Sequence, residues 1–87
     1  MIQFDLKPGE KLISVIFVSV DQKIHYSLIC KNTDIFSNVE NALYKQFPEY
    51  KETENYFLIN GVKVNKYKTL TENKIINSSI ITLNTYD

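Results

Sequence analysis

The segment YFLINGVKVNKYKTLTENKIINSSIITLN, from Tyr56 to Asn84, decides the fold of this chain. A strand over 56–59 is followed by Asn60-Gly61, a pair that favours a two-residue hairpin turn, and by a short strand over 62–64. An irregular stretch over 65–79 contains a helical turn at 71–74 and two expected core residues, Leu70 and Ile75. A last strand covers 80–85. No catalytic group occurs in this segment, which favours a binding surface over a site of chemistry.

Two more strands are predicted upstream. Residues 12–20, LISVIFVSV, are β-branched and aromatic without a breaker, and residues 24–31, IHYSLICK, return after a short polar turn. The returning strand alternates cleanly between two faces, one with Tyr26, Leu28 and Cys30 and the other with His25, Ser27 and Ile29. The first strand is apolar on both of its faces.

One helix is predicted between these strands and the deciding segment. Thr33-Asp34 is an N-cap signal. Apolar residues then recur at helical spacing and form a single stripe of about three turns, made of Phe36, Val39, Leu43 and Phe47. Pro48 ends the helix, because the residue before a proline avoids the helical region. A charged loop follows over 50–55.

The predicted order is β-β-α-β-β-β. One helix with one apolar stripe must lie on one face of a sheet, so the fold class is α+β and the arrangement is a β-grasp. Residues 12–87 form this single domain. Residues 1–11 form an N-terminal arm, either an edge strand in which Ile2, Phe4 and Leu6 alternate or a disordered lead-in, and Pro8-Gly9 marks a turn.

Composition argues against several classes of partner. Ten lysines and no arginine balance ten acidic residues to a net charge of zero. Nucleic-acid binding is disfavoured, because Arg is the residue that reads phosphates and bases in bidentate fashion. No apolar run approaches the roughly 18 residues of a membrane span, and no signal peptide is present. The single Cys30 cannot form an internal disulfide, which favours a reducing compartment, cytoplasmic or nuclear.

No residue pattern indicates an enzyme, a cofactor or a metal site. His25 has no acid pair near it in sequence, and no Cys/His cluster exists that would bind zinc. Cys30 is expected to face inward as a small core hydrophobe rather than act as a nucleophile. A nucleophile, a base and an orienting group do not converge, so we expect no enzymatic activity.

From about Ser14 to the C-terminus the chain resembles ubiquitin and its relatives. FLINGVKV resembles the strand-turn-strand of that family with its Gly, KTLTENKI resembles the loop that fills the core, and DIFSNV resembles the start of the helix. The order and spacing of these motifs carry the resemblance, which needs one extra residue after the helix. It implies a ubiquitin-like fold.

Two departures from that family argue against a covalent modifier. Conjugated relatives end in Gly-Gly, a pair without side chains that threads the narrow cleft of activating enzymes, whereas this chain ends in Asn84-Thr85-Tyr86-Asp87. No lysine occupies the positions that match the chain-forming lysines of ubiquitin, which are Ser19, Ile24, Glu40, Ala42, Gln46, Val62 and Asn77. The resemblance therefore implies a fixed, non-covalent docking module.

The candidate site depends on how the strands are oriented. We expect the helix to cover Ile16, Val18, Leu28, Ile81 and Leu83, which leaves an apolar stripe of Val15, Phe17 and Ile80, joined by Ile29, on the other face. By resemblance, the docking patch of the family maps to Leu58, Gly61, Thr82 and Asn84. The predicted partner-binding residues are Val15, Phe17, His25, Leu58, Ile80 and Thr82. Self-association through this face, or cover by the arm, are the alternatives to a protein partner.

The sequence thus predicts a non-covalent protein–protein interaction module, the N-terminal domain of a larger protein, with ubiquitin-pathway proteins among the implied partners. Two alternatives stay open. One is a modifier precursor without its Gly-Gly tail. The other is a β-grasp domain that binds small GTPases through the edge of the 24–31 strand, near Lys23 and Lys31. On this orientation, Phe17→Asp is expected to leave folding intact and to abolish partner capture.

Overall fold

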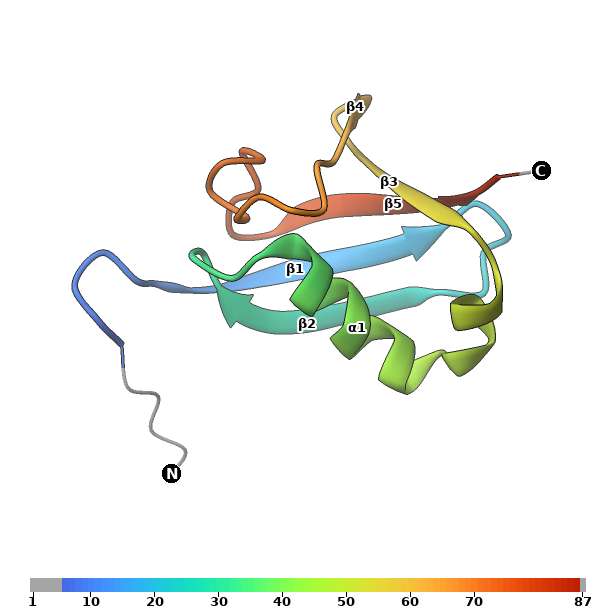
Figure 1. Ribbon diagram of the computed structural model, residues 1–87, viewed down its shortest axis with the longest axis horizontal. Helices are drawn as coiled ribbons and strands as arrows, with labels where there is room; N and C mark the ends of the chain where they lie inside the picture. Colours follow the sequence, from blue (N-terminus) through green and yellow to red (C-terminus); the bar gives the residue numbers. More distant parts are fainter. Residues whose placement is uncertain (1–5, 87) are drawn as a thin grey trace.

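A computed structural model describes residues 6–86 of the chain. Five strands form one sheet in the order β2-β1-β5-β3-β4 (Figure 1). Their bounds are β1 (Leu12–Ser19), β2 (His25–Lys31), β3 (Asn55–Ile59), β4 (Val62–Lys63) and β5 (Ser79–Thr85). The first and last strands, β1 and β5, pair in parallel, and all other pairs are antiparallel. The predicted order of elements along the chain, β-β-α-β-β-β, is confirmed, and each strand begins and ends within one residue of its predicted bounds.

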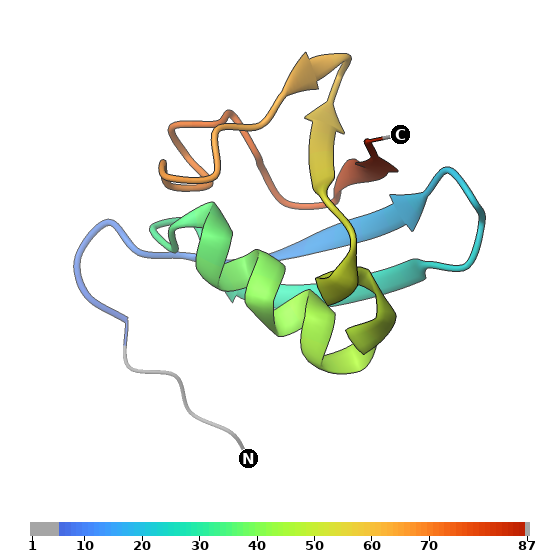
Figure 2. The same ribbon diagram turned by 45° about the vertical axis from the view of Figure 1, so that its right-hand side comes forward.

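The helix α1 (Phe36–Gln46) crosses one face of the sheet, and a short 3-10 helix, η1 (Pro48–Glu52), leads from it to β3 (Figure 2). This confirms the α+β β-grasp arrangement. The η1 turn replaces part of the predicted charged loop. The hairpin between β3 and β4 is also confirmed, since Asn60 and Gly61 both take positive φ angles of 51° and 78°.

The predicted N-cap of α1 is wrong. The cap position is Ile35, which makes no side-chain cap bond, and the Asp34 carboxylate instead accepts the backbone N–H of Lys31 at 2.8 Å. The first two N–H groups of the helix donate to the carbonyl oxygens of Lys68 and Lys66, at 3.0 and 2.9 Å. A distant loop therefore satisfies the free backbone donors that a local side chain satisfies in most helices.

The core lies between α1 and the sheet and centres on three phenylalanines. The Phe36 and Phe57 ring centroids are 4.9 Å apart, and Phe17 lies 5.8 Å from Phe57 and 6.3 Å from Phe36. Leu70 and Ile75 are 0% and 2% exposed, which confirms them as core residues of the segment between β4 and β5. Cys30 is buried as predicted.

The predicted orientation of β1 is wrong. Val15 and Phe17 are completely buried against α1, whereas Ile16 and Val18 are half-buried on the opposite face. The neighbouring strands decide this orientation, because directly paired residues share a face of a sheet. Phe17 pairs with Tyr26 of β2 and with Ile81 of β5, and both of these face the core.

The orientations of β2 and β5 are confirmed. Leu28 packs against the core, and Ile81 and Leu83 are buried, while Ile80 is 58% exposed. The error is thus limited to β1, whose residues are apolar on both faces. A strand of this kind carries no alternation that could orient it, and only its pairing partners do so.

The described part of the arm turns at Pro8-Gly9, as predicted. Glu10 N–H donates to the Lys7 carbonyl at 3.0 Å, and Gly9 has a φ of 83°. The base of the arm is attached to the loop after β2, since the Lys11 N–H donates to Asn32 Oδ1 at 2.7 Å. The arm leaves the end of the sheet there (Figure 1). The interpretation that Ile2 and Phe4 cover the sheet falls outside the described residues.

Candidate functional site

The sheet has one covered and one uncovered face. Helix α1 lies on one side, and no element of residues 6–86 crosses the other side, which we call the open face (Figures 1 and 2). An antiparallel sheet with one solvated face commonly carries polar residues there. The residues on the open face therefore show whether this sheet only faces water or also presents an apolar surface.

Of the six predicted partner-binding residues, four lie on the open face and two do not. Val15 and Phe17 have 0% exposure, so their side chains cannot reach a partner of the folded chain. His25 and Ile80 are exposed on β2 and β5. Leu58 and Thr82 are half-buried on β3 and β5.

The strand register brings these residues into one row across all five strands. Val18 of β1 pairs with His25 of β2 on one side and with Thr82 of β5 on the other. Thr82 pairs with Leu58 of β3, and Leu58 pairs with Lys63 of β4. The row therefore reads His25, Val18, Thr82, Leu58, Lys63 from one edge of the sheet to the other.

Two apolar residues of this surface were missed by sequence reasoning. Ile16 and Val18 occupy the positions assigned to Val15 and Phe17, and Ile16 pairs with Ile80 beside the row. We call the set Ile16, Val18, Leu58, Ile80 and Thr82 the docking face. The clean alternation of β2 was the signal that could have identified them, because Ser27 and His25, which both point outward, pair with Ile16 and Val18.

The two ends of the row carry the side chains that can be positively charged. His25 is exposed at the β2 edge, and Lys63 lies at the β4 edge. Lys63 Nζ donates to the Tyr86 hydroxyl at 2.5 Å and stands 5.7 Å from the centroid of the Tyr56 ring. No Asp or Glu occurs in any of the five strands. The row is therefore uncharged at its centre, with the Lys63 ammonium at one end and the His25 ring at the other.

One polar atom beside the docking face lacks a partner. Asn84 Nδ2 is buried and makes no hydrogen bond, and it is the one such side-chain nitrogen or oxygen within residues 6–86. Asn84 follows Thr82 on the outward side of β5 and pairs with Tyr56. A buried unpaired donor costs about 1–3 kcal/mol, and such groups are uncommon in folded proteins.

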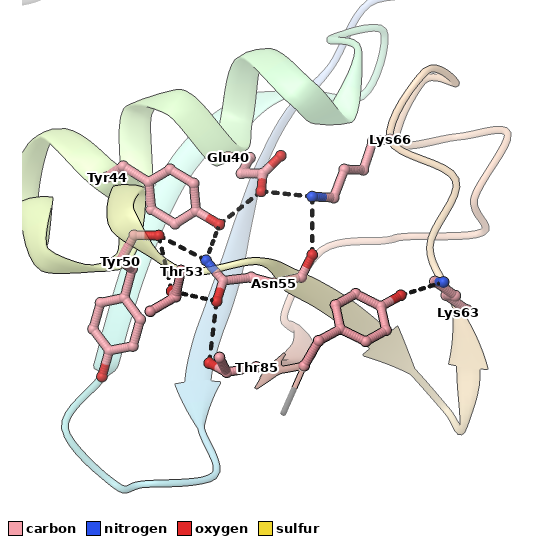
Figure 3. Close-up of polar contacts among 9 residues, drawn as sticks. Glu40, Tyr44, Tyr50, Thr53, Asn55, Lys63, Lys66 and Thr85 are labelled. Carbon is pink, nitrogen blue, oxygen red and sulfur yellow. Dashed lines mark hydrogen bonds and ion pairs between the residues drawn. The ribbon is translucent and has the colours of Figure 1, made fainter.

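A second polar cluster lies on the other side of the sheet, between α1, η1 and β3 (Figure 3). The buried Glu40 carboxylate accepts the Tyr44 hydroxyl at 2.6 Å and Lys66 Nζ at 2.9 Å. Lys66 Nζ also donates to the Asn55 carbonyl at 3.1 Å. Burial raises the pKa of Tyr44 well above its usual range, and the hydrogen bond to Glu40 adds to this shift.

The Asn55 side chain completes this cluster. Its Nδ2 donates to the Tyr44 hydroxyl at 2.9 Å and to the Tyr50 carbonyl at 2.8 Å, while its Oδ1 accepts the hydroxyls of Thr53 and Thr85. The polar side chains of this cluster form their hydrogen bonds with one another, and these bonds hold the helix to β3 and β5. None of these side chains is oriented toward a substrate. The sequence signal for it was the i, i+4 spacing of Glu40 and Tyr44 on the helix.

Within residues 6–86, no three His, Cys, Asp or Glu side chains gather as a metal ion would require. No helix in that range has the length and apolar character to cross a membrane. Burial raises the pKa of the Cys30 thiol to about 11, which keeps it protonated near neutral pH.

Comparison with known proteins identifies the fold of the chain. No protein-family model matches the chain, and no curated protein matches it in sequence. Among solved structures, it is similar to a protein designed de novo on the basis of ubiquitin, with a TM-score of 0.75 and 17% sequence identity. The match covers 93% of this chain and 94% of that protein. The chain therefore has a ubiquitin-like β-grasp fold, and at this identity the likeness carries no function.

Proposed function

We propose that this chain is a non-covalent protein–protein interaction module that binds its partner through the docking face. The observation that carries the proposal is the gathering of Ile16, Val18, Leu58 and Ile80 on an uncovered sheet face. A contiguous apolar patch on a solvated face commonly marks a contact surface. No cofactor is needed for this role.

Energetics favour Ile80 and Leu58 as the main contacts. Burying a large aliphatic side chain fully contributes roughly 1.5–3 kcal/mol, and Ile80 is 58% exposed before any partner binds. Leu58 lies one strand away from Ile80 and is flanked in the row by Thr82 and Lys63, so a partner that covers the row also covers Leu58.

The charge pattern indicates what kind of partner fits. With Lys63 at one end and no carboxylate in the strands, the complementary surface is an apolar strip with an acidic residue at the end that faces Lys63. Charges at the rim of an interface mainly raise the association rate and the selectivity. Proteins of the ubiquitin pathway are one source of such partners, as the resemblance implies.

The test combines capture with mapping. Partners that the wild-type chain captures from an extract are identified, purified and titrated into the ¹⁵N-labelled chain. We expect the largest amide shifts on β1, β3 and β5. Leu58→Asp should lose capture and these shifts, because it places a carboxylate on the apolar docking face, where a partner would have to bury it. Tyr67→Asp is the control, since Tyr67 is 85% exposed and lies outside the docking face.

Circular dichroism must show that both variants are folded. Equal capture by Leu58→Asp and wild type would refute the proposal. Shifts confined to the free edge of β2 would instead support the GTPase-binding alternative.

A further inference from the structure

The β3–β4 turn and the segment before β5 form a second surface away from the middle of the docking face. Both stand on the same side of β5 (Figures 1 and 2). Three of the exposed large apolar residues meet there, Val62, Ile76 and Ile80, with exposures of 65%, 69% and 58%. We call Asn60, Val62, Lys74, Ile76 and Ile80 the corner.

Two adjoining hollows divide the corner. One has a volume of about 270 Å³ and includes Val62 and the buried Ile59 in its lining. The other, of about 310 Å³, includes Ile76 and Ile80. Asn60 and Lys74 line both hollows, so the lysine lies between a mainly apolar recess and a mixed one in which Ile76 and Ile80 are the apolar residues.

Lys74 has no partner within residues 6–86. No hydrogen bond or ion pair joins its ammonium group to any described residue. The one carboxylate that lines either hollow belongs to Glu72, whose Oε1 accepts the Thr69 N–H at 3.0 Å. That backbone hydrogen bond lowers the pKa of Glu72. The Glu72 carboxylate therefore binds the Thr69 backbone and forms no ion pair with Lys74.

The backbone of the corner is held in place before any ligand binds. Lys74 N–H donates to the Thr71 carbonyl at 2.9 Å, and Ile76 N–H donates to Ser79 Oγ at 2.9 Å. Asn77 Oδ1 accepts the N–H of Ser14 on β1 at 2.9 Å. A preformed site loses less conformational entropy when it binds a ligand.

We propose that the corner is a second docking site, for an extended partner segment in which one carboxylate side chain lies between two apolar ones. Residues i and i+2 of an extended strand point to the same side and stand about 7 Å apart. An acidic residue over Lys74 therefore places the apolar residues two positions before and after it over the two hollows. The inference is independent of the proposed function, since only Ile80 belongs to both surfaces.

The test uses a synthetic peptide, acetyl-Ser-Val-Thr-Glu-Thr-Ile-Ser-amide, and a matched peptide with Gln in place of Glu. Each is titrated into the ¹⁵N-labelled 87-residue chain at about 50 mM and 500 mM salt. We expect amide shifts at residues 60–62 and 74–80, about fivefold weaker binding of the Gln peptide at low salt, and a smaller difference at high salt.

Lys74→Asn is the decisive variant. Lys74 has a φ of 61°, a conformation that Asn tolerates better than most residues, so the change removes the charge without straining the turn. It should bind both peptides equally, with the affinity of wild type for the Gln peptide. Lys68→Asn is the matched control, an exposed lysine that lines neither hollow, and should behave as wild type.

Several results would overturn the inference. They are equal binding of the two peptides by wild type, shifts centred on Leu58 and Val18, no binding at several millimolar peptide, or a dimer whose dissociation on dilution shifts the corner amides. The last result would assign the corner to a second copy of this chain. Loss of peptide binding in Ile76→Asp but not in Leu58→Asp separates this site from the docking face.

Discussion

Phe17 and Ile16 are neighbours in the chain with opposite roles, and replacing each by Ala tests the orientation of β1. Phe17 is fully buried and contacts the rings of Phe36 and Phe57. Removing a buried Phe side chain costs about 3–5 kcal/mol, from lost burial and from the cavity left behind. Ile16 is half-buried on the open face, so its truncation should cost only about 1–2 kcal/mol.

The loss at Phe17 is large relative to the whole stability of a domain, which is about 5–15 kcal/mol. A cost of about 3–5 kcal/mol should lower the Tm by about 15–30 °C in a chain of this size. The two variants lose a similar strand propensity, so the difference between them, at least about 1 kcal/mol, reports mainly how the two side chains are oriented.

The assay is urea unfolding followed by far-UV circular dichroism, because the chain has no Trp. The m-value should not change between variants, so that the shift in midpoint measures stability. An Ile16→Ala variant that is less stable than Phe17→Ala would refute the orientation of β1 and, with it, the docking face. The same reasoning predicts that Phe17→Asp unfolds the chain, contrary to the expectation from sequence.

Two further predictions concern polar groups. Asn55→Ala removes four hydrogen bonds, two buried and two part-buried, and should cost about 2–4 kcal/mol by urea unfolding. The exposed Asn41→Ala should change stability by less than about 0.5 kcal/mol. The hydroxyls of Ser19 and Tyr50 lower the pKa of Asp21 from 3.8 to about 2, so its carboxylate stabilises the fold above pH 4 and loses this effect as the pH falls from about 4 to 2. The urea midpoint of wild type should therefore fall more between pH 5 and pH 3 than the midpoint of Asp21→Asn does. An equal fall in the two proteins would contradict this.

The fold could be predicted from sequence because most of its elements carry a local signal. Asn60-Gly61 specified the hairpin, and Pro48 ended the helix where the apolar stripe ended. The N-cap of α1 could not be predicted, because its donors are satisfied by carbonyls of Lys66 and Lys68, about thirty residues away in the chain. That contact exists only after the tertiary structure has formed.

The candidate site was predicted in part for a similar reason. Leu58, Ile80, Thr82 and His25 follow strands with clean alternation, and their positions on the open face agree with the structure. Val15 and Phe17 lie on a strand that is apolar on both faces, so its orientation depends on which residues it pairs with. Their burial follows from the register with β2 and β5, which no local pattern encodes.

The parallel pairing of β1 with β5 has a consequence for how the chain folds. The strand synthesised last lies in the middle of the sheet, between the strand synthesised first and β3. Until β5 has left the ribosome, β1 and β3 have no common neighbour, and their backbone groups remain available to other chains. Contacts between such distant parts of a sequence slow folding, so we expect this domain to fold in one step once β5 is available, and to be exposed to aggregation until then.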